Sequence, residues 1–299
     1  MGKIIGKMFC AMTTAADQKR LRTQTLPTGA EKVAEECYTP DNHPLQRVSI
    51  YRPEGIEGLL PVIFDVHGGG WYYGDHNLNF HYDRTLAAQG YVVVGVGYRL
   101  APEATYVDQL RDVAKALCYV VEHAPRFGID LSRAFLTGDS AGGHLSSLLL
   151  RTMVDHDYRV SLQVDEVPVH IRAACFTCGA HHPTNMAKIP LARAFFGSVI
   201  GKGYRRSPYY DLADFRLPEG LEGVPPMLFT TCYGDFLRKD VLQSFEETHS
   251  AGYDCRLLFR EEQTNHKLGH VYNVLCPEWE ESIETNQAML DFFEESLLD

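Results

Sequence analysis

A serine between two glycines is the sequence feature whose surroundings most clearly indicate chemistry. Residues 138–142 read Gly-Asp-Ser-Ala-Gly and fit the pattern G-x-S-x-G. A serine in this pattern sits on a tight turn from a strand to a helix, so that its hydroxyl projects from the edge of a sheet. The helix that follows also directs its N-terminus at the site, which favours developing negative charge. We therefore predict that Ser140 is a nucleophile, and we expect its neighbour Asp139 to contact the substrate.

A glycine cluster lies upstream of this serine. Residues 67–71 read His-Gly-Gly-Gly-Trp and follow an apolar run that is typical of a buried strand. Glycines let backbone N–H groups approach a substrate closely and bind an oxyanion. We expect the N–H groups of Gly68, Gly69 and Ala141 to form such an oxyanion hole, and Trp71 to contact the substrate.

Three motifs together resemble one known family. His-Gly-Gly-Gly-Trp at 67–71, Tyr-Arg-Leu-Ala-Pro-Glu at 98–103 and Gly-Asp-Ser-Ala-Gly-Gly at 138–143 are similar in type and spacing to the hormone-sensitive-lipase-like family of microbial carboxylesterases. The resemblance extends from about residue 60 to the C-terminus. It implies an α/β-hydrolase core with a small cap, hydrolysis of carboxylic esters by a serine nucleophile, and no metal or other cofactor.

The resemblance also indicates the acid and the base that a serine nucleophile needs. The family carries its triad aspartate in a D-x-L-x-D pattern after a strand, and Asp235 occupies the first position of that pattern; Asp240 is a weaker candidate. An aromatic residue usually follows two positions after the family's base, and Tyr272 stands in that relation to His270. The usual distance from the aspartate favours His266 instead. We predict His270 as the base and keep His266 as the alternative.

A cysteine and histidine cluster suggests a competing metal site. Two thiols and two imidazoles could bind zinc tetrahedrally. However, the first cysteine lies in an expected strand, where positions three apart point to opposite faces, and no second ligand cluster follows. We therefore expect no metal, and we expect the two histidines to line the mouth of the site or lie on the surface. The four residues are Cys175, Cys178, His181 and His182.

The substrate is only partly indicated. Aromatic residues between 181 and 226 favour a restricted apolar pocket and hence short acyl chains: Phe195, Phe196, Tyr204, Tyr209 and Tyr210. Two other functions remain open. One is amide hydrolysis of the arylformamidase type, which uses a similar glycine loop. The other is a non-catalytic receptor for a small molecule on the same fold.

Strands alternate with helices from about residue 60 onward, which is typical of a mostly parallel sheet covered on both faces. We expect strands at 48–53, 59–66, 91–96, 134–137, 171–176, 227–232 and 255–259. Helices are expected at 79–89, 108–123, 145–153, 241–251 and 282–298. Together with the family resemblance, this alternation leads us to expect an α/β-hydrolase domain over 46–299, with a cap-like insertion at about 181–226. Residues 1–45 are predicted to form a cap segment, with helical potential at 17–22 and 31–36.

Composition limits the partners. With 39 acidic and 28 basic residues the net charge is −11, which disfavours nucleic acid and anionic membranes as partners. Eight scattered cysteines and an N-terminus without a long apolar run indicate a reducing, cytoplasmic location. A small-molecule ester is the expected partner. Members of the resembled family often dimerise, so a homodimer is also expected.

Overall fold

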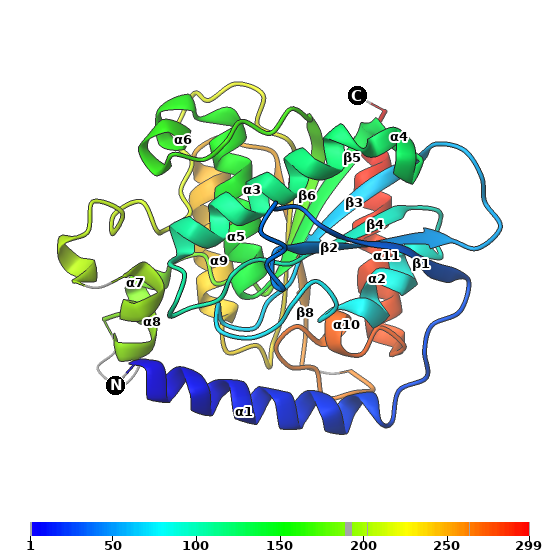
Figure 1. Cartoon of the computed structure of the whole chain (residues 1–299). Coiled ribbons are helices and arrows are strands. Elements are labelled where there is room, and N and C mark those ends of the chain that lie inside the picture. The colour runs from blue at the N-terminus through cyan, green and yellow to red at the C-terminus, as the bar shows by residue number, and fades with distance from the viewer. Residues whose placement is uncertain (1, 189–192, 202, 263, 299) are drawn as a thin grey trace.

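A single central sheet organises the molecule (Figure 1). The computed structural model describes residues 2–188, 193–201, 203–262 and 264–298. In this part of the chain the strand order is β1-β2-β4-β3-β5-β6-β7-β8; the pairings β1–β2 and β2–β4 are antiparallel and the remaining ones are parallel. The strands are β1 Ala30–Cys37, β2 Arg47–Pro53, β3 Leu60–Val66, β4 Val92–Val96, β5 Ile129–Asp139, β6 Ile171–Thr177, β7 Met227–Cys232 and β8 Cys255–Arg260.

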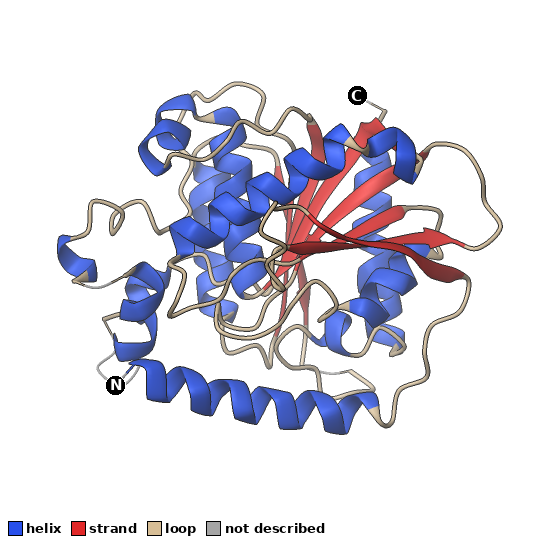
Figure 2. Ribbon diagram, viewed as in Figure 1, coloured by secondary structure: helices blue, strands red, loops and turns tan. Residues whose placement is uncertain are grey.

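Helices cover both faces of this sheet (Figure 2). One face carries α3 Tyr106–Glu122, α5 Ala141–Val154 and α9 Arg238–Ser250, and the other carries α2 Phe80–Ala87, α10 Tyr272–Leu275 and α11 Glu280–Glu295. The remaining helices are α1 Gly2–Leu21, α4 Ala124–Phe127, α6 His156–Leu162, α7 Pro183–Met186, α8 Arg193–Ile200 and the 3-10 turn η1 Tyr204–Arg206. The predicted α/β-hydrolase architecture is thereby confirmed.

The parallel strands are buried on both faces, which explains why they read as continuous apolar runs. Register then fixes the place of the functional loops. Val66, the last residue of β3, pairs with Gly138 near the end of β5. The glycine cluster after β3 and the serine turn after β5 therefore begin at the same edge of the sheet.

The N-terminal segment differs from the prediction in two ways. The helix over 17–22 is the end of a longer helix, α1, which lies across the side of the molecule where the parallel strands end (Figure 1). Residues 31–36, predicted as helical, instead belong to β1. Pairing with β2 supplies the backbone hydrogen bonds of β1, and its exposed glutamates and lysine suit an open edge that must not pair with other chains. A cap boundary at 45 is therefore wrong, because β1 is part of the main sheet.

The region between β6 and β7 carries short helices rather than a separate layer. Its helix α8 packs against α1 beside the ends of the parallel strands. Part of the predicted insertion at 181–226, including Pro190, lies outside the described residues. No helix in the described chain is long and apolar enough to cross a membrane.

Candidate active site

Ser140 lies on a sharp turn that its neighbours make sterically possible. Its backbone has φ 52° and ψ −116°, a left-handed conformation that costs energy in a residue with a Cβ atom. A Cβ atom on Gly142 would overlap the carbonyl oxygen of Val66, so only glycine fits there. The turn is fixed by two hydrogen bonds to the end of β6 and the loop after it, from Ser140 N to Thr177 O and from Ala180 N to Ser140 O, at 2.9 and 3.0 Å.

The structure brings Ser140, Asp235 and His270 together. His270 Nε2 lies 2.9 Å from Ser140 Oγ, and His270 Nδ1 lies 2.7 Å from Asp235 Oδ1. The loop after β5 carries the serine, the loop after β7 the aspartate, and the loop after β8 the histidine (Figure 1). Three loops that are distant in sequence therefore converge at one edge of the sheet.

Both carboxylate oxygens of Asp235 accept hydrogen bonds. Its Oδ1 also accepts the Leu237 backbone N–H, and its Oδ2 accepts the Thr231 hydroxyl, at 2.9 and 2.7 Å. Burial alone would raise the pKa of Asp235, but the hydrogen bonds from His270, Leu237 and Thr231, together with the charge of His270, leave this pKa below its ordinary value. The carboxylate therefore stays ionised and selects the tautomer in which Nδ1 of His270 bears the proton.

The alternative base, His266, lies in a different contact. Its Nδ1 is 2.7 Å from Glu281 Oε2, its backbone N–H donates to Glu281 Oε1, and its ring stacks on Trp279. Among the described residues, His270 is the histidine that contacts Ser140. The second acidic candidate, Asp240, accepts from His182 instead.

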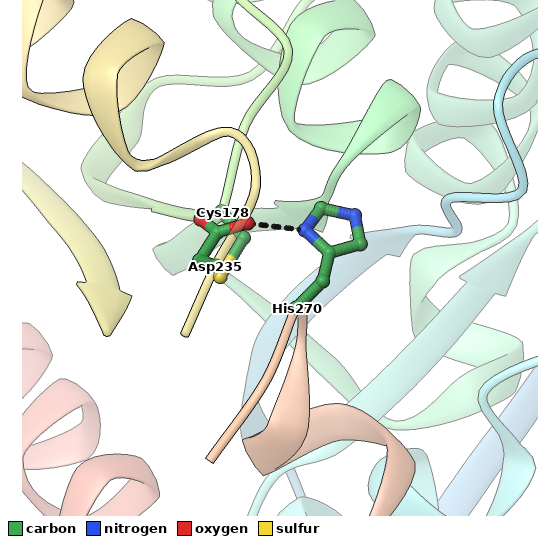
Figure 3. A group of neighbouring side chains, drawn as sticks. All are labelled: Cys178, Asp235 and His270. Carbon is green, nitrogen blue, oxygen red and sulfur yellow. Dashed lines mark hydrogen bonds and ion pairs between the residues drawn. The ribbon is translucent and has the colours of Figure 1, made fainter. Parts of the chain in front are cut away.

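Cys178 lies beside the acid and the base (Figure 3). Its Sγ accepts the Val271 N–H at 3.4 Å, directly after His270. Within the described chain, Cys178, Asp235 and His270 are the one group of three such side chains close enough to share a metal ion. Burial, together with the charge of Asp235, raises the pKa of Cys178, which disfavours the thiolate that a metal would require.

The cysteines and histidines of the competing zinc reading do not converge. Cys175 and Cys178 belong to the core on the α2 and α11 face. His181 packs on the other face among Phe176, Phe215 and Phe229, while His182 bridges Asp240 and Glu247. Both histidines are fully buried. The expectation that they line the mouth or the surface is therefore wrong.

The glycine loop after β3 is hydrogen-bonded to Asp139, which corrects the expectation that Gly68 is an oxyanion donor. The Gly68 N–H donates to Asp139 Oδ1 at 2.9 Å, so it is not free to bind an oxyanion. Among the described residues no acceptor is recorded for the N–H groups of Gly69, Gly70 and Ala141. Gly69 and Gly70 have φ of 93° and 60°, which a side chain would strain.

Asp139 and Trp71, which we expected to contact the substrate, are both buried and hydrogen-bonded within the protein. Asp139 Oδ1 is occupied by Gly68 and by the Asn79 amide. Trp71 is only 2 % exposed, and its Nε1 donates to His144 Nδ1 at 3.2 Å. Each residue is next to a functional one in sequence but turns inward, where it supports the loop.

The motif at 98–103 also supports the glycine loop, which sequence reasoning did not foresee. The Tyr98 hydroxyl donates to the carbonyl oxygens of His67 and Gly68, at 2.7 and 3.1 Å. The Ala101 N–H donates to the Trp71 carbonyl oxygen at 2.8 Å. The motif follows β4, which pairs with β3 in parallel, so the two loops lie side by side and these hydrogen bonds fix the glycine loop.

Aromatic rings from α1 and α8 lie against the same loop. A Cβ atom on Gly70 would come within 2.9 Å of the Phe9 ring and 3.3 Å of the Phe195 ring. Phe9 and Phe195 pack edge to face, and Phe195 also packs on Tyr72. Phe9 was not a sequence candidate, because nothing in residues 1–20 indicates that this helix reaches the glycine loop.

Comparison with known proteins agrees with this architecture. The model of the α/β-hydrolase fold family matches residues 63–268. Carboxylesterase NlhH of Mycobacterium tuberculosis is 35 % identical over 163 residues, which cover 51 % of each protein. The probable carboxylic ester hydrolase LipM of the same organism is 35 % identical over 141 residues, 45 % of this chain and 31 % of that protein. The chain thus spans about a third to a half of these curated relatives.

A solved structure matches over nearly its whole length. Esterase B from Lactobacillus rhamnosis superposes with a TM-score of 0.92 at 29 % identity, covering 98 % of this chain and 94 % of that one. A second crystal structure of the same esterase, described as inhibited by a C4-C4 SN3 tributyrin phosphonate, gives the same TM-score. The resemblance to hormone-sensitive-lipase-like esterases is confirmed, and the chain belongs to the α/β-hydrolase fold family.

Proposed function

We propose that this protein is a serine carboxylesterase that hydrolyses short-acyl carboxylic esters. The observation that carries the proposal is the continuous hydrogen-bonded chain from Ser140 Oγ through His270 to Asp235. Such a chain turns a weakly nucleophilic hydroxyl into an attacking group, because the imidazole takes its proton as the new bond forms. The esterase names of the relatives support the same reaction class.

The proposed reaction has two stages. Ser140 Oγ attacks the ester carbonyl while Nε2 of His270 takes the hydroxyl proton; the alcohol then leaves with that proton, and the acyl group stays on Ser140. Water, deprotonated by His270, releases the acid. Asp235 keeps Nδ1–H oriented and stabilises the imidazolium in both stages.

We assign the oxyanion contacts to the free N–H groups of Gly69, Gly70 and Ala141. Ala141 begins α5, so the partial positive charge at the start of that helix adds to its hydrogen bond. The loss of one such donor typically lowers kcat by about 10²–10³. Gly68 acts differently, because its N–H holds the loop on Asp139.

The preference for short acyl chains rests on the rings beside Gly70. Phe9 and Phe195 lie against Gly70, one of the assigned oxyanion donors, and we propose that they limit the space for the acyl or alcohol group there. Large side chains at this point leave room for small groups and exclude long ones. An amide substrate would need the same nucleophile, so substrate comparison decides between the two.

The test is hydrolysis of p-nitrophenyl esters from acetate to palmitate by the wild type and Ser140→Ala. We expect the highest kcat/KM at short chains and a loss of at least about 10⁴-fold in Ser140→Ala. Labelling by a fluorophosphonate probe should also require Ser140. Undiminished activity in Ser140→Ala would overturn the proposal, faster turnover of an aryl formamide would favour amide hydrolysis, and a wild type that resists labelling would favour a receptor.

Two further points belong to the same proposal. A cytoplasmic location is supported by the eight cysteines, which are all unpaired in the structure. A homodimer is proposed from the family resemblance alone. Cell fractionation and light scattering on the purified protein test these two points separately.

A further inference from the structure

Three buried carboxyl groups lie beneath the glycine loop without a basic side chain to neutralise them. Asp65 is in β3, Asp83 in α2 and Asp139 at the end of β5; they are 1 %, 0 % and 5 % exposed. None of the ion pairs formed by described Lys, Arg and His side chains includes any of the three. Oδ1 of Asp65 and both oxygens of Asp83 are buried without a hydrogen-bond donor. Burying charges in this way is costly unless something compensates them.

A proton is the compensation that the geometry allows. Gly95 is the residue of β4 that pairs with Asp65, and a Cβ atom on Gly95 would lie 2.9 Å from Asp83 Oδ2, so the carboxyl group of Asp83 lies beside β3 at the level of Asp65. Two carboxyl groups can donate to one another only when one of them is protonated. Within the described chain the three carboxyls do not form a group close enough to share a metal ion. The pair therefore resembles two acids that share one proton.

The electrostatics agree with this arrangement. Burial and the charge of Asp139 raise the pKa of Asp65 above its ordinary value, and burial and the charge of Asp65 raise the pKa of Asp83 as well. The other titratable groups that face the three carboxyls are hydroxyls from surrounding elements and the catalytic imidazole: Tyr51, Tyr82, Tyr98 and, facing Asp139, His270. Burial raises the pKa of each of these tyrosines, so they stay neutral and do not offset the carboxylate charge.

A path of hydrogen bonds joins this pair to the loop. The amide Nδ2 of Asn79 donates one bond to Asp65 Oδ2 at 2.9 Å and another to Asp139 Oδ1 at 2.8 Å. The same oxygen of Asp139 accepts the Gly68 N–H. Both hydrogens of the Asn79 amide are thus used, and its orientation depends on Asp65 and Asp139 together.

We propose that Asp65, Asp83 and Asn79 are positioning residues for the glycine loop, and that the proton shared by the two aspartates keeps the loop in its working shape. This inference rests on the proposed esterase function. When the pair loses its proton, three adjacent carboxylates repel one another and the contact between Asp139 and Gly68 weakens. The oxyanion donors next to Gly68 then lose their alignment. Because these donors act in the transition state, kcat falls as pH rises while KM changes little.

The test compares pH profiles of kcat and KM for p-nitrophenyl butyrate in the wild type, Asp83→Asn and Asp83→Ala. An asparagine amide can donate to Asp65 at every pH, so the alkaline decline in kcat should shift upward by at least about one pH unit. Alanine offers no donor, so kcat should fall about tenfold or more across the range, with KM within about threefold. Circular dichroism at each pH separates unfolding from loss of catalysis.

Asp155→Asn is the matched control, because Asp155 is a largely buried carboxylate that pairs with Arg151 at the end of α5 opposite Ser140. It should keep the wild-type alkaline decline. The inference is overturned if Asp83→Asn declines at the same pH as the wild type, or if Asp155→Asn shifts equally. Ser140→Ala supplies the background rate. If the wild type shows no Ser140-dependent hydrolysis, the proposed function fails; if it does but the profiles coincide, only this inference fails.

Discussion

His266 and His270 lie four residues apart, and each contacts a carboxylate, but only His270 also contacts Ser140 among the described residues. His270 Nδ1 meets Asp235 and His266 Nδ1 meets Glu281, each at 2.7 Å. Each imidazole also touches an aromatic ring: Phe236 lies 4.2 Å from His270 and Trp279 lies 4.4 Å from His266, between ring centroids. The carboxylate distances are the same, whereas the rings differ in tilt: the planes meet at 43° for Phe236 and His270 and at 8° for Trp279 and His266.

The difference lies at the second ring nitrogen. Nε2 of His270 reaches Ser140 Oγ, whereas His266 has a side chain that is 40 % exposed and stacked flat on Trp279. A carboxylate orients an imidazole, but the atom opposite decides whether it serves as a base. The pair His266–Glu281 instead fastens the loop after β8 to the first turn of α11.

The largest expected effect separates the two imidazoles. His270→Ala removes the proton acceptor of Ser140 and should lower kcat by about 10⁴-fold or more, whereas His266→Ala should lower it by less than about tenfold. Steady-state kinetics with p-nitrophenyl butyrate measures both. Equal losses in the two variants would contradict the assignment of His270 as the base.

Glu281→Gln should change stability in acid rather than the chemistry. Burial alone would raise the pKa of Glu281, but hydrogen bonds from the His266 backbone and ring lower it from 4.5 to about 2. A lowered carboxyl pKa stabilises the fold above about pH 4.5, and this contribution is lost as the pH falls toward 2. The Tm of Glu281→Gln should therefore lie below that of the wild type at neutral pH, and the difference should shrink in acid. Thermal unfolding from pH 7 to pH 2.5 tests this; a constant difference would contradict it.

The smallest effect compares the two aromatic rings. Phe236 is 75 % exposed, so Phe236→Ala should cost less than about 1 kcal/mol of stability. It should lower kcat/KM by about threefold to tenfold, because the ring touches the imidazole that becomes charged in the reaction. Trp279→Ala should do the reverse, with near-normal kcat and a Tm lower by several degrees, since Trp279 packs beside Tyr272 and Leu268. Calorimetry and kinetics on both variants check the pattern.

The nucleophile and the parallel strands could be predicted from local sequence patterns. Ser140 could be found from sequence because its turn requires small residues at fixed positions, and the parallel strands could be found because burial on both faces makes them apolar. The choice between His270 and His266 could not be made from the residues alone, since loop length and the third partner are set by how β7 and β8 dock.

The predictions that are wrong concern residues whose conformation depends on contacts with distant parts of the chain. The glutamate-rich residues of β1 form a strand only because β2 lies beside them. Asp139 and Trp71 are close in sequence to functional groups, yet their side chains point to the interior. Asp65 is a carboxylate within an otherwise apolar strand and therefore needs a compensating partner, which no local pattern identifies; Asp83 lies beside it across Gly95 of β4.

Because the three loops are far apart in sequence, the Ser140–His270–Asp235 contacts form late in the folding of this protein. Ser140, Asp235 and His270 follow β5, β7 and β8, so a nascent chain can assemble most of the sheet before these three side chains meet. Only docking of β8 at the sheet's far edge delivers the histidine. Active-site titration with a phosphonate would therefore count completely folded molecules, and a misfolded or truncated population would be silent in it.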